Sequence, residues 1–194
     1  MADPSPLAPL VAALGDLVKW LRDEHVKGLV IGGVAASILG RPRATRDVDA
    51  VVWIGERSAQ SFLESARRHG FVPRIADAVA FARRSSILLL RHTSSAIDID
   101  VSLGALPFER EAIGRGISRV VGTLTIPVPT PEDLVVMKAV AHRPRDAADI
   151  ESVLQANPGT DREFVRRWVR EFAKALDAPD IAADLERIFA RVSS

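Results

Sequence analysis

Two aspartates, Asp47 and Asp49, stand one residue apart at the start of the apolar run DVDAVVWI. In a strand, residues two apart point to the same face, so these carboxylates are predicted to project side by side. Like charges this close repel unless a cation lies between them or one of them takes up a proton. Mg²⁺ binds such hard oxygen ligands, commonly one or two carboxylates together with substrate phosphates. The pattern therefore predicts a divalent-cation site; the plain alternative is a solvent-facing pair on an edge strand, or one aspartate capping a turn.

A second pair of acids follows in the run AIDIDVSLG, where Asp98 and Asp100 also share a face of a predicted strand. If this strand pairs beside the first, one of its carboxylates would complete a site of three oxygen ligands. The residues by themselves leave open which of the two it is.

Phosphate-binding features precede the first acid pair. Gly32 and Gly33 join a short buried strand, LVI, to a predicted helix, VAASILG. Glycines permit close backbone approach, and the free N–H groups of a helix N-terminus attract phosphate. Arg43, Thr45 and Arg46 then supply cations and a hydroxyl beside the acids. Together with the carboxylates, these groups match the needs of phosphoryl or nucleotidyl transfer, in which metal ions clamp the attacking and leaving oxygens.

The elements that position these residues predict an α/β (α+β) fold with a mixed sheet. Residues 6–25 have apolar positions at helical spacing, and the segment 71–103 contains four strand-like runs: FVPRI, AVAFAR, SILLLRH and AIDIDVSL. The segment ISRVVGTLTIPV is predicted to form a hairpin that turns near Gly122. After Thr130, a helix-capping residue, the remaining sequence is helical. We therefore expect an N-terminal helix packed on the core (1–27), an α/β core (28–129) and a C-terminal helical region (130–194).

The composition limits the classes of protein. The 194 residues are 47% hydrophobic and include no cysteine, which excludes disulfides and thiol chemistry. Apolar runs are too short for a membrane span, and the N-terminus lacks the basic region of a signal peptide. We expect a cytoplasmic protein with no membrane partner. The net charge of +1 gives no global attraction for nucleic acid.

The order of a glycine pair, a short helix, RATRDVD and a later strand with a third aspartate resembles the DNA polymerase β-like nucleotidyltransferase superfamily. More narrowly, the chain is similar to the small bacterial nucleotidyltransferases grouped with the AbiEii toxins of type IV toxin–antitoxin systems. The stretches IDVSLGALPFEREAI and PEDLVVMKAVAHRPRDAADIESVL carry that narrower resemblance. It covers about residues 28–155 and implies a nucleotidyltransferase core followed by a helical bundle.

For the first acid pair, the resemblance implies that Asp47 and Asp49 bind the metal, Mg²⁺ or Mn²⁺, and that Thr45 contacts phosphate. It favours Asp100 as the third carboxylate, because the family pattern places the acid directly before a short run such as VSLG. Asp98 is the alternative candidate for the third carboxylate. In such families the third aspartate also helps to activate the attacking hydroxyl.

For the nucleotide, the resemblance implies that Gly32 and Gly33 hold the phosphates of an NTP. Lys138 would neutralise the triphosphate, and Asp149 would orient the region of Lys138 or Arg143. Lys138 lies in the apolar segment LVVMKAVAH, so a buried position is expected, although a solvated helix lysine is the alternative.

The expected reaction transfers NMP from an NTP to a hydroxyl acceptor and releases pyrophosphate. The acceptor is expected to be tRNA or a protein, as for a toxin, with a cognate antitoxin protein as a further partner. A small-molecule acceptor of the aminoglycoside type and a non-catalytic nucleotide-binding member of the fold are the alternatives. Arginines at helical spacing in residues 162–170 could follow an RNA backbone, but such a run is usually a solvated face. Glycosyltransferases and aspartyl phosphatases fit poorly, because their acids normally follow an apolar strand, whereas here they precede AVVWI.

Overall fold

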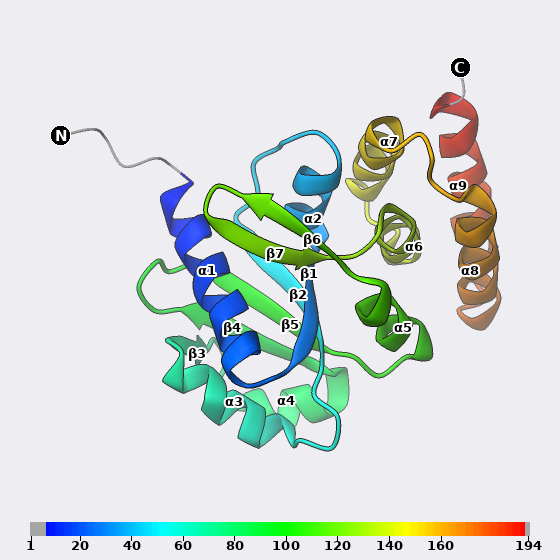
Figure 1. Cartoon of the computed structure of the whole chain (residues 1–194). Coiled ribbons are helices and arrows are strands. Elements are labelled where there is room, and N and C mark those ends of the chain that lie inside the picture. The colour runs from blue at the N-terminus through cyan, green and yellow to red at the C-terminus, as the bar shows by residue number, and fades with distance from the viewer. Residues whose placement is uncertain (1–6, 193–194) are drawn as a thin grey trace. The chain divides into compact units, whose positions relative to one another are not determined.

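The computed structural model describes residues 7–192, so residues 1–6 and 193–194 of the predicted terminal regions lie outside it. The described chain divides into two compact units (Figure 1). The sheet unit comprises residues 7–31 and 44–128, and the helical unit comprises residues 32–43 and 129–192. Residues 32–43 are thus grouped with the C-terminal helices, whereas the sequence-based division placed them in the α/β core.

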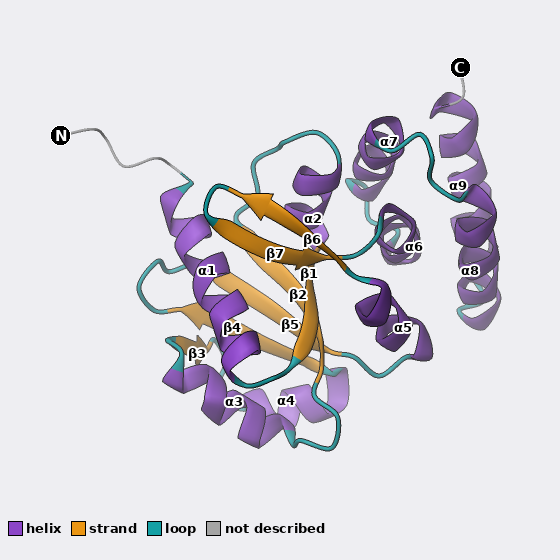
Figure 2. Cartoon of the chain, viewed as in Figure 1, coloured by secondary structure: helices purple, strands orange, loops and turns teal. Residues whose placement is uncertain are grey.

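A five-stranded mixed sheet forms the centre of the sheet unit, with the strand order β1-β2-β5-β4-β3 (Figure 2). Its strands are β1 (Lys27–Ile31), β2 (Asp47–Trp53), β3 (Phe71–Pro73), β4 (Ile87–His92) and β5 (Asp98–Leu103). β2 and β5 run parallel, and the other neighbouring strands run antiparallel. β2 is therefore an interior strand between β1 and β5, although two other strands separate β2 from β5 in the sequence. The predicted mixed sheet is confirmed.

Helices and a hairpin complete the sheet unit. They are α1 (Ala8–Asp23), α3 (Ala59–Arg68), α4 (Ala78–Ser85), α5 (Pro107–Arg115), β6 (Ile117–Val121) and β7 (Leu124–Val128). α1 contacts β1, β2 and β7, while α3 and α4 contact β3 and β4 respectively. The hairpin turns at Gly122 with a φ of 60°, a left-handed conformation that favours glycine. The predicted N-terminal helix and hairpin are confirmed for the described residues.

The prediction for AVAFAR was wrong, because this segment forms the helix α4 rather than a strand. Ala78 and Ala82, four residues apart, are both almost fully buried, which is the spacing of one helical face. Over six residues, small apolar side chains are compatible with either periodicity, so packing against β4 decides. The helix ends at Ser86, whose φ of 56° turns the chain into β4.

Aromatic packing joins α1 and α3 to the sheet. The ring of Trp20 stacks on Phe62 with centroids 4.5 Å apart, and it lies 5.4 Å from the ring of Phe71. All three side chains are almost completely buried, and each contributes about 1.5–3 kcal/mol by its removal from water. The indole N–H of Trp20 donates to Oγ of Ser65 at 2.8 Å, which satisfies the polar atom of this core residue.

The helical unit contains α2 (Gly32–Leu39), α6 (Pro131–Ala141), α7 (Asp146–Ala156), α8 (Arg162–Ala175) and α9 (Pro179–Val192). α6 begins as the sequence predicts: the hydroxyl of Thr130 accepts a hydrogen bond from the N–H of Asp133 at 3.2 Å. α6 packs against α2, α7, α8 and α9, so it is the central helix of this unit. Across residues 7–192, no helix combines the length and the apolar character needed to span a bilayer.

Candidate active site

The parallel pairing of β2 with β5 places the two acid pairs next to each other. In the register of these strands Asp47 pairs with Asp98, and Asp49 pairs with Asp100. The condition set by the sequence, that the second acid strand pairs beside the first, is therefore met. Because β2 is an interior strand, the alternative of an edge-strand aspartate pair does not apply.

The alternation of each strand separates the acids from the core. Val48 of β2 and Ile99 of β5 are fully buried on one face of the sheet. Asp47 is exposed and Asp49 and Asp100 are half-buried on the other face. Backbone pairing and side-chain alternation together gather several carboxylates on one patch of that face.

Two arginines that the sequence analysis missed bind the acids of β5. Nη1 of Arg74 donates to Oδ2 of Asp98 at 3.1 Å, and Nη2 of the same guanidinium donates to Oδ1 of Asp100. Nε of Arg91 donates to Oδ1 of Asp98 at 2.7 Å. Arg74 arrives here because its N–H bonds to the carbonyl of Leu89, the β4 residue that pairs with Asp100. No spacing in the sequence marks Arg74 for this position, because the pairing of β3 with β4 places it.

The two acids of β5 differ in their electrostatics. Burial raises the pKa of Asp100, and the nearby charges of Asp47 and Asp98 raise it further, while Arg74 acts in the opposite direction. The hydrogen bond from Arg91 lowers the pKa of Asp98, against the effect of its partial burial. Asp98 is thus a carboxylate held by two arginines. Asp100 is repelled by Asp47 and Asp98, and this repulsion, which Arg74 offsets in part, would be reduced further by an added cation.

The donor set on this face fits a hard divalent cation by its chemistry, since it consists of carboxylate oxygens in adjacent, parallel strands. In the arrangement of residues 7–192, no three His, Asp or Glu side chains form a ready-made metal cluster. Arg74 supplies the positive charge at Asp98 and Asp100 in this arrangement. The hydroxyl of Thr45 donates to Oδ1 of Asp47 at 3.1 Å, and Arg46 is exposed next to it in the sequence.

The predicted phosphate-binding glycines open α2 in the helical unit. Gly32 has a φ of 62°, a conformation that an L side chain rarely adopts. It directly follows Ile31, the last residue of β1, which pairs with Asp49 in the sheet. The carbonyl of Gly33 accepts a hydrogen bond from the hydroxyl of Ser37 at 2.9 Å, one turn further along α2.

Lys138 is buried inside the helical unit, so the alternative of a solvated lysine does not apply. Its side chain is only 8% exposed, and Nζ lies 2.8 Å from Oδ1 of Asp146 and 2.7 Å from Oδ2 of Asp149. Arg43 donates to both oxygens of Asp149, from Nε at 2.7 Å and from Nη2 at 2.8 Å. Asp149 therefore contacts both Lys138 and Arg43. Arg143 contributes its backbone N–H to Oδ2 of Asp146 at 3.0 Å.

The ion pairs determine the charge state of Asp149. Burial alone would raise its pKa, but the hydrogen bonds from Arg43 and Lys138 outweigh that effect, so the pKa is lowered. Two cations and two carboxylates thus form one network that links the end of the α2 connection to α6 and α7. This network holds the Lys138 ammonium in one place.

A mixed sheet with paired acids on two parallel interior strands, followed by a helical unit, defines a nucleotidyltransferase fold, and solved structures agree. A nucleotidyltransferase-like protein from Paracoccidioides brasiliensis has a TM-score of 0.59 and 13% identity, over 92% of each chain. The antibiotic-resistance factor ANT(2'')-Ia also has a TM-score of 0.59, with 15% identity over 88% of this chain and 95% of that one. The lincosamide antibiotic adenylyltransferase LnuA has a TM-score of 0.50 and 12% identity, over 75% of this chain and 94% of its own.

The family is clear from the sequence. The family described as nucleotidyl transferase AbiEii toxin, type IV TA system, matches residues 24–193. The chain belongs to this family and is a nucleotidyltransferase. No curated protein matches it by sequence.

Proposed function

We propose that the protein transfers NMP from an NTP to a hydroxyl acceptor, with release of pyrophosphate and in dependence on Mg²⁺ or Mn²⁺. The observation that carries this proposal is the register of β2 and β5, which sets Asp49 beside Asp100 on the face that also bears Asp47. Nucleotidyl transfer needs carboxylates converging from separate segments, because a divalent cation must be held while leaving room for phosphate oxygens.

Asp47, Asp49 and Asp100 would hold the cation, which stabilises the charge that develops on the transferring phosphoryl group. Asp98 is excluded from this set in the proposal, because Arg91 and Arg74 already neutralise it. Asp100 also serves as the proton acceptor for the attacking hydroxyl. Its register opposite Asp49, next to the candidate cation site, supports that role.

Other groups of the chain are proposed to bind the NTP. The backbone of Gly32 and Gly33 would hold phosphate oxygens, as the left-handed conformation at Gly32 permits close approach. Lys138 would place its ammonium on the triphosphate, with Asp149 fixing its orientation. Arg43, Arg46 and the Thr45 hydroxyl add further phosphate donors. None of these groups contacts the nucleobase, so they do not select one NTP over another.

The acceptor is proposed to be a hydroxyl of an RNA or of a protein, as the toxin family suggests. We also propose that a cognate antitoxin protein is a partner of the chain. The arginines of α8 give little support for RNA. Arg166 forms ion pairs with Glu163 and Glu186, and Arg170 lies 4.0 Å from Glu186, so these two arginines already have acidic partners. Arg67 and Arg83, at the ends of α3 and α4, instead lack ion-pair partners among residues 7–192 and line one hollow of the sheet unit.

A small-molecule acceptor is the second candidate, and the fold shared with ANT(2'')-Ia and LnuA favours it. The two candidates differ in what they need for binding. An RNA acceptor requires cations along its backbone and loses affinity with salt, whereas a small acceptor does not.

The test is transfer from labelled NTPs to a panel of RNAs, proteins and aminoglycosides, with pyrophosphate release as the common readout. We expect Asp49→Asn to lower transfer by at least about 100-fold, since changes outside the ligand shell alone already cost 10- to 100-fold at metal sites. The control is Glu56→Gln, which changes an exposed carboxylate in the loop after β2. Equal transfer by wild type and Asp49→Asn, or no transfer by wild type with any NTP, would contradict the proposal.

A further inference from the structure

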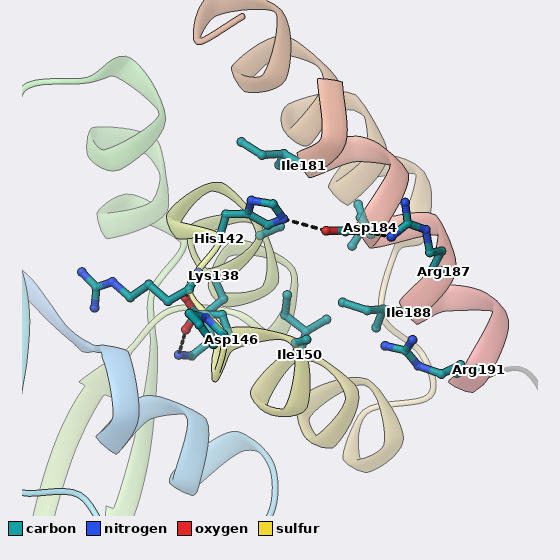
Figure 3. Close-up of a pocket in the computed structure, with 14 residues that line it drawn as sticks. Lys138, His142, Asp146, Ile150, Ile181, Asp184, Arg187, Ile188 and Arg191 are labelled. Carbon is teal, nitrogen blue, oxygen red and sulfur yellow. Dashed lines mark hydrogen bonds and ion pairs between the residues drawn. The ribbon is translucent and has the colours of Figure 1, made fainter. Parts of the chain in front are cut away.

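A cavity of about 320 Å³ lies within the helical unit, between the α6–α7 turn and α9 (Figure 3). Small-molecule sites commonly range from roughly 300 to 1,000 Å³, so this volume suits a small ligand. All of its lining residues belong to the helical unit, so none of them is a carboxylate of β2 or β5.

Aliphatic side chains form the floor of the cavity. Ile150 of α7 and Leu185 and Ile188 of α9 line it, and each is at most 4% exposed. In Figure 3, Ile150 and Ile188 project toward one another from the two facing helices. Such a floor stabilises an apolar group by about 25 cal/mol for each Å² that the group removes from water.

Four cations and two carboxylates belong to the rest of the lining: Lys138, Arg143, Arg187, Arg191, Asp146 and Asp184. Three of the cations have carboxylate partners, because Lys138 pairs with Asp146 and Asp149, Arg187 with Asp184, and Arg191 with Glu151. Asp184 serves two partners, since it accepts from Nε2 of His142 at 2.8 Å and also pairs with Arg187. Arg143 has a guanidinium without an ion-pair partner in the described part of the chain. Arg143 is therefore the lining cation that is left to bind an anion.

We infer that this cavity is a binding site for a small organic anion with an apolar body, such as a medium-chain or aromatic carboxylate. The apolar body lies along Ile150 and Ile188, and the carboxylate faces Arg143. An organic cation is disfavoured by the guanidinium of Arg143. A fully neutral ligand makes no ion pair with Arg143, so it binds more weakly.

An occupant acts on the buried lysine through Asp146. This residue lines the cavity, and it accepts hydrogen bonds from Nζ of Lys138 and from the backbone N–H of Arg143. A carboxylate that draws Arg143 toward the cavity changes the turn that holds Asp146. We expect the rate of NMP transfer to change on binding. This consequence rests on the proposed function, whereas the binding site itself does not.

Binding is tested by calorimetry on the full chain without NTP, with octanoate as the anionic probe and 1-octanol as its neutral analogue. Ala147→Phe fills the cavity, because Ala147 is a half-buried lining residue of α7. Ala148→Phe is the matched control, since Ala148 is the exposed neighbour on the same helix. We expect saturable octanoate binding in wild type and Ala148→Phe and none in Ala147→Phe. We expect Arg143→Gln to weaken octanoate roughly tenfold, as for one charge-assisted hydrogen bond, and to leave octanol unchanged.

Absence of saturable octanoate binding in wild type would overturn the inference, as would wild-type affinity in an Ala147→Phe variant that melts as a folded protein. If Ala147→Phe does not fold, Ala147→Leu replaces it, because leucine fills part of the same space. Octanoate binding with wild-type affinity in folded Ala147→Leu would then overturn the inference. Octanol binding as tightly as octanoate would overturn the assignment of an anion. A transfer rate that octanoate leaves unchanged in wild type would overturn only the coupling to Lys138.

Discussion

Asp98 and Asp100 share a strand and a face, yet the structure gives them different environments. Asp98 has a lowered pKa because two arginines bind it, and Asp100 has a raised pKa because of burial and neighbouring carboxylates. A carboxylate that binds a metal ion must first give up its existing cationic partner. Asp100 has one such partner, Arg74, whereas Asp98 has two. This difference gives a physical reason to prefer Asp100 as the third carboxylate.

We predict that Asp100→Asn lowers NMP transfer by about 100- to 10,000-fold, the range for loss of a general base. Asp98→Asn removes an ion-pair partner from Arg74 and Arg91 and lowers transfer by less than about tenfold, because exposed ion pairs contribute at most about 1 kcal/mol. Single-turnover rates with a saturating NTP provide the comparison. A larger loss in Asp98→Asn than in Asp100→Asn would reverse the assignment.

Asp149 gives a prediction for the pH dependence of stability. Its pKa is lower in the folded protein than in the unfolded chain, where it is about 3.9. Its stabilising contribution is therefore complete above the unfolded pKa and is lost as the pH falls through the folded pKa. Asp149→Asn leaves the cations of Arg43 and Lys138 without this carboxylate, which costs about 3 kcal/mol at pH 7.

Urea unfolding of wild type and Asp149→Asn at pH 7 and near pH 3 measures this effect. The difference in the free energy of unfolding should shrink at the lower pH, because the Asp149 carboxylate of the unfolded wild-type chain takes up a proton below its pKa, whereas the folded one does so only at a still lower pH. Glu171→Gln on the exposed surface of α8 is the control, and it should change stability little at either pH. A difference that is constant across this range would show that the ion pairs of Asp149 do not stabilise the fold.

At the scale of elements, the close approach of β1 and β2 keeps Asp49 in register. A Cβ added at Gly28 would lie 2.8 Å from Cγ1 of Val52 and 2.9 Å from the carbonyl oxygen of Val51. The backbone atom cannot move aside without disturbing the pairing of these strands. We predict that Gly28→Ala destabilises the protein by about 1–3 kcal/mol, as overpacking does, and measurement of chemical unfolding tests this.

Gly114 of α5 is the matched control for Gly28, because an added Cβ there meets nothing within 4 Å. Alanine favours a helix interior over glycine, so Gly114→Ala should stabilise the protein by about 0.5–1 kcal/mol. Equal effects of the two substitutions on the free energy of unfolding would mean that the close contact between β1 and β2 does not restrict the side chain at residue 28.

Single elements with a clear local signal could be predicted from the sequence. The cap at Thr130 and the glycine turn at Gly122 fix a helix start and a hairpin through backbone chemistry that involves only nearby residues. The segment AVAFAR failed because alanine has no strong side-chain preference that separates a buried strand from a buried helix. Contact with β4 decided that segment.

At the scale of the whole molecule, ligand binding to the native state should raise its stability. If Asp47 and Asp49 hold a cation with the NTP, saturation at about 100 times Kd adds about 2.7 kcal/mol. For a chain of this size that corresponds to a rise in Tm of about 5–10 °C. We predict this rise with MgCl₂ plus NTP in wild type, measured by scanning calorimetry, and a much smaller rise in the Asp47→Asn and Asp49→Asn variants.

Equal thermal shifts in wild type and both variants would place the nucleotide and metal elsewhere in the molecule. A non-hydrolysable NTP is the appropriate ligand, because turnover during the scan would lower its concentration. MgCl₂ alone serves as the control for effects of ionic strength.

The sequence by itself determined which residues could do chemistry and the local structure around them. The spacing of Asp47 and Asp49 fixes a shared face in any strand, and Gly32 at the start of α2 permits a backbone conformation that few other residues adopt. The tertiary structure decided which strands are neighbours, so it alone placed Asp100 beside Asp49 and Arg74 on both acids of β5. The physical reason is that side-chain direction follows from backbone geometry over two or three residues. The order β1-β2-β5-β4-β3 instead depends on hydrogen bonds and packing between segments far apart in the chain.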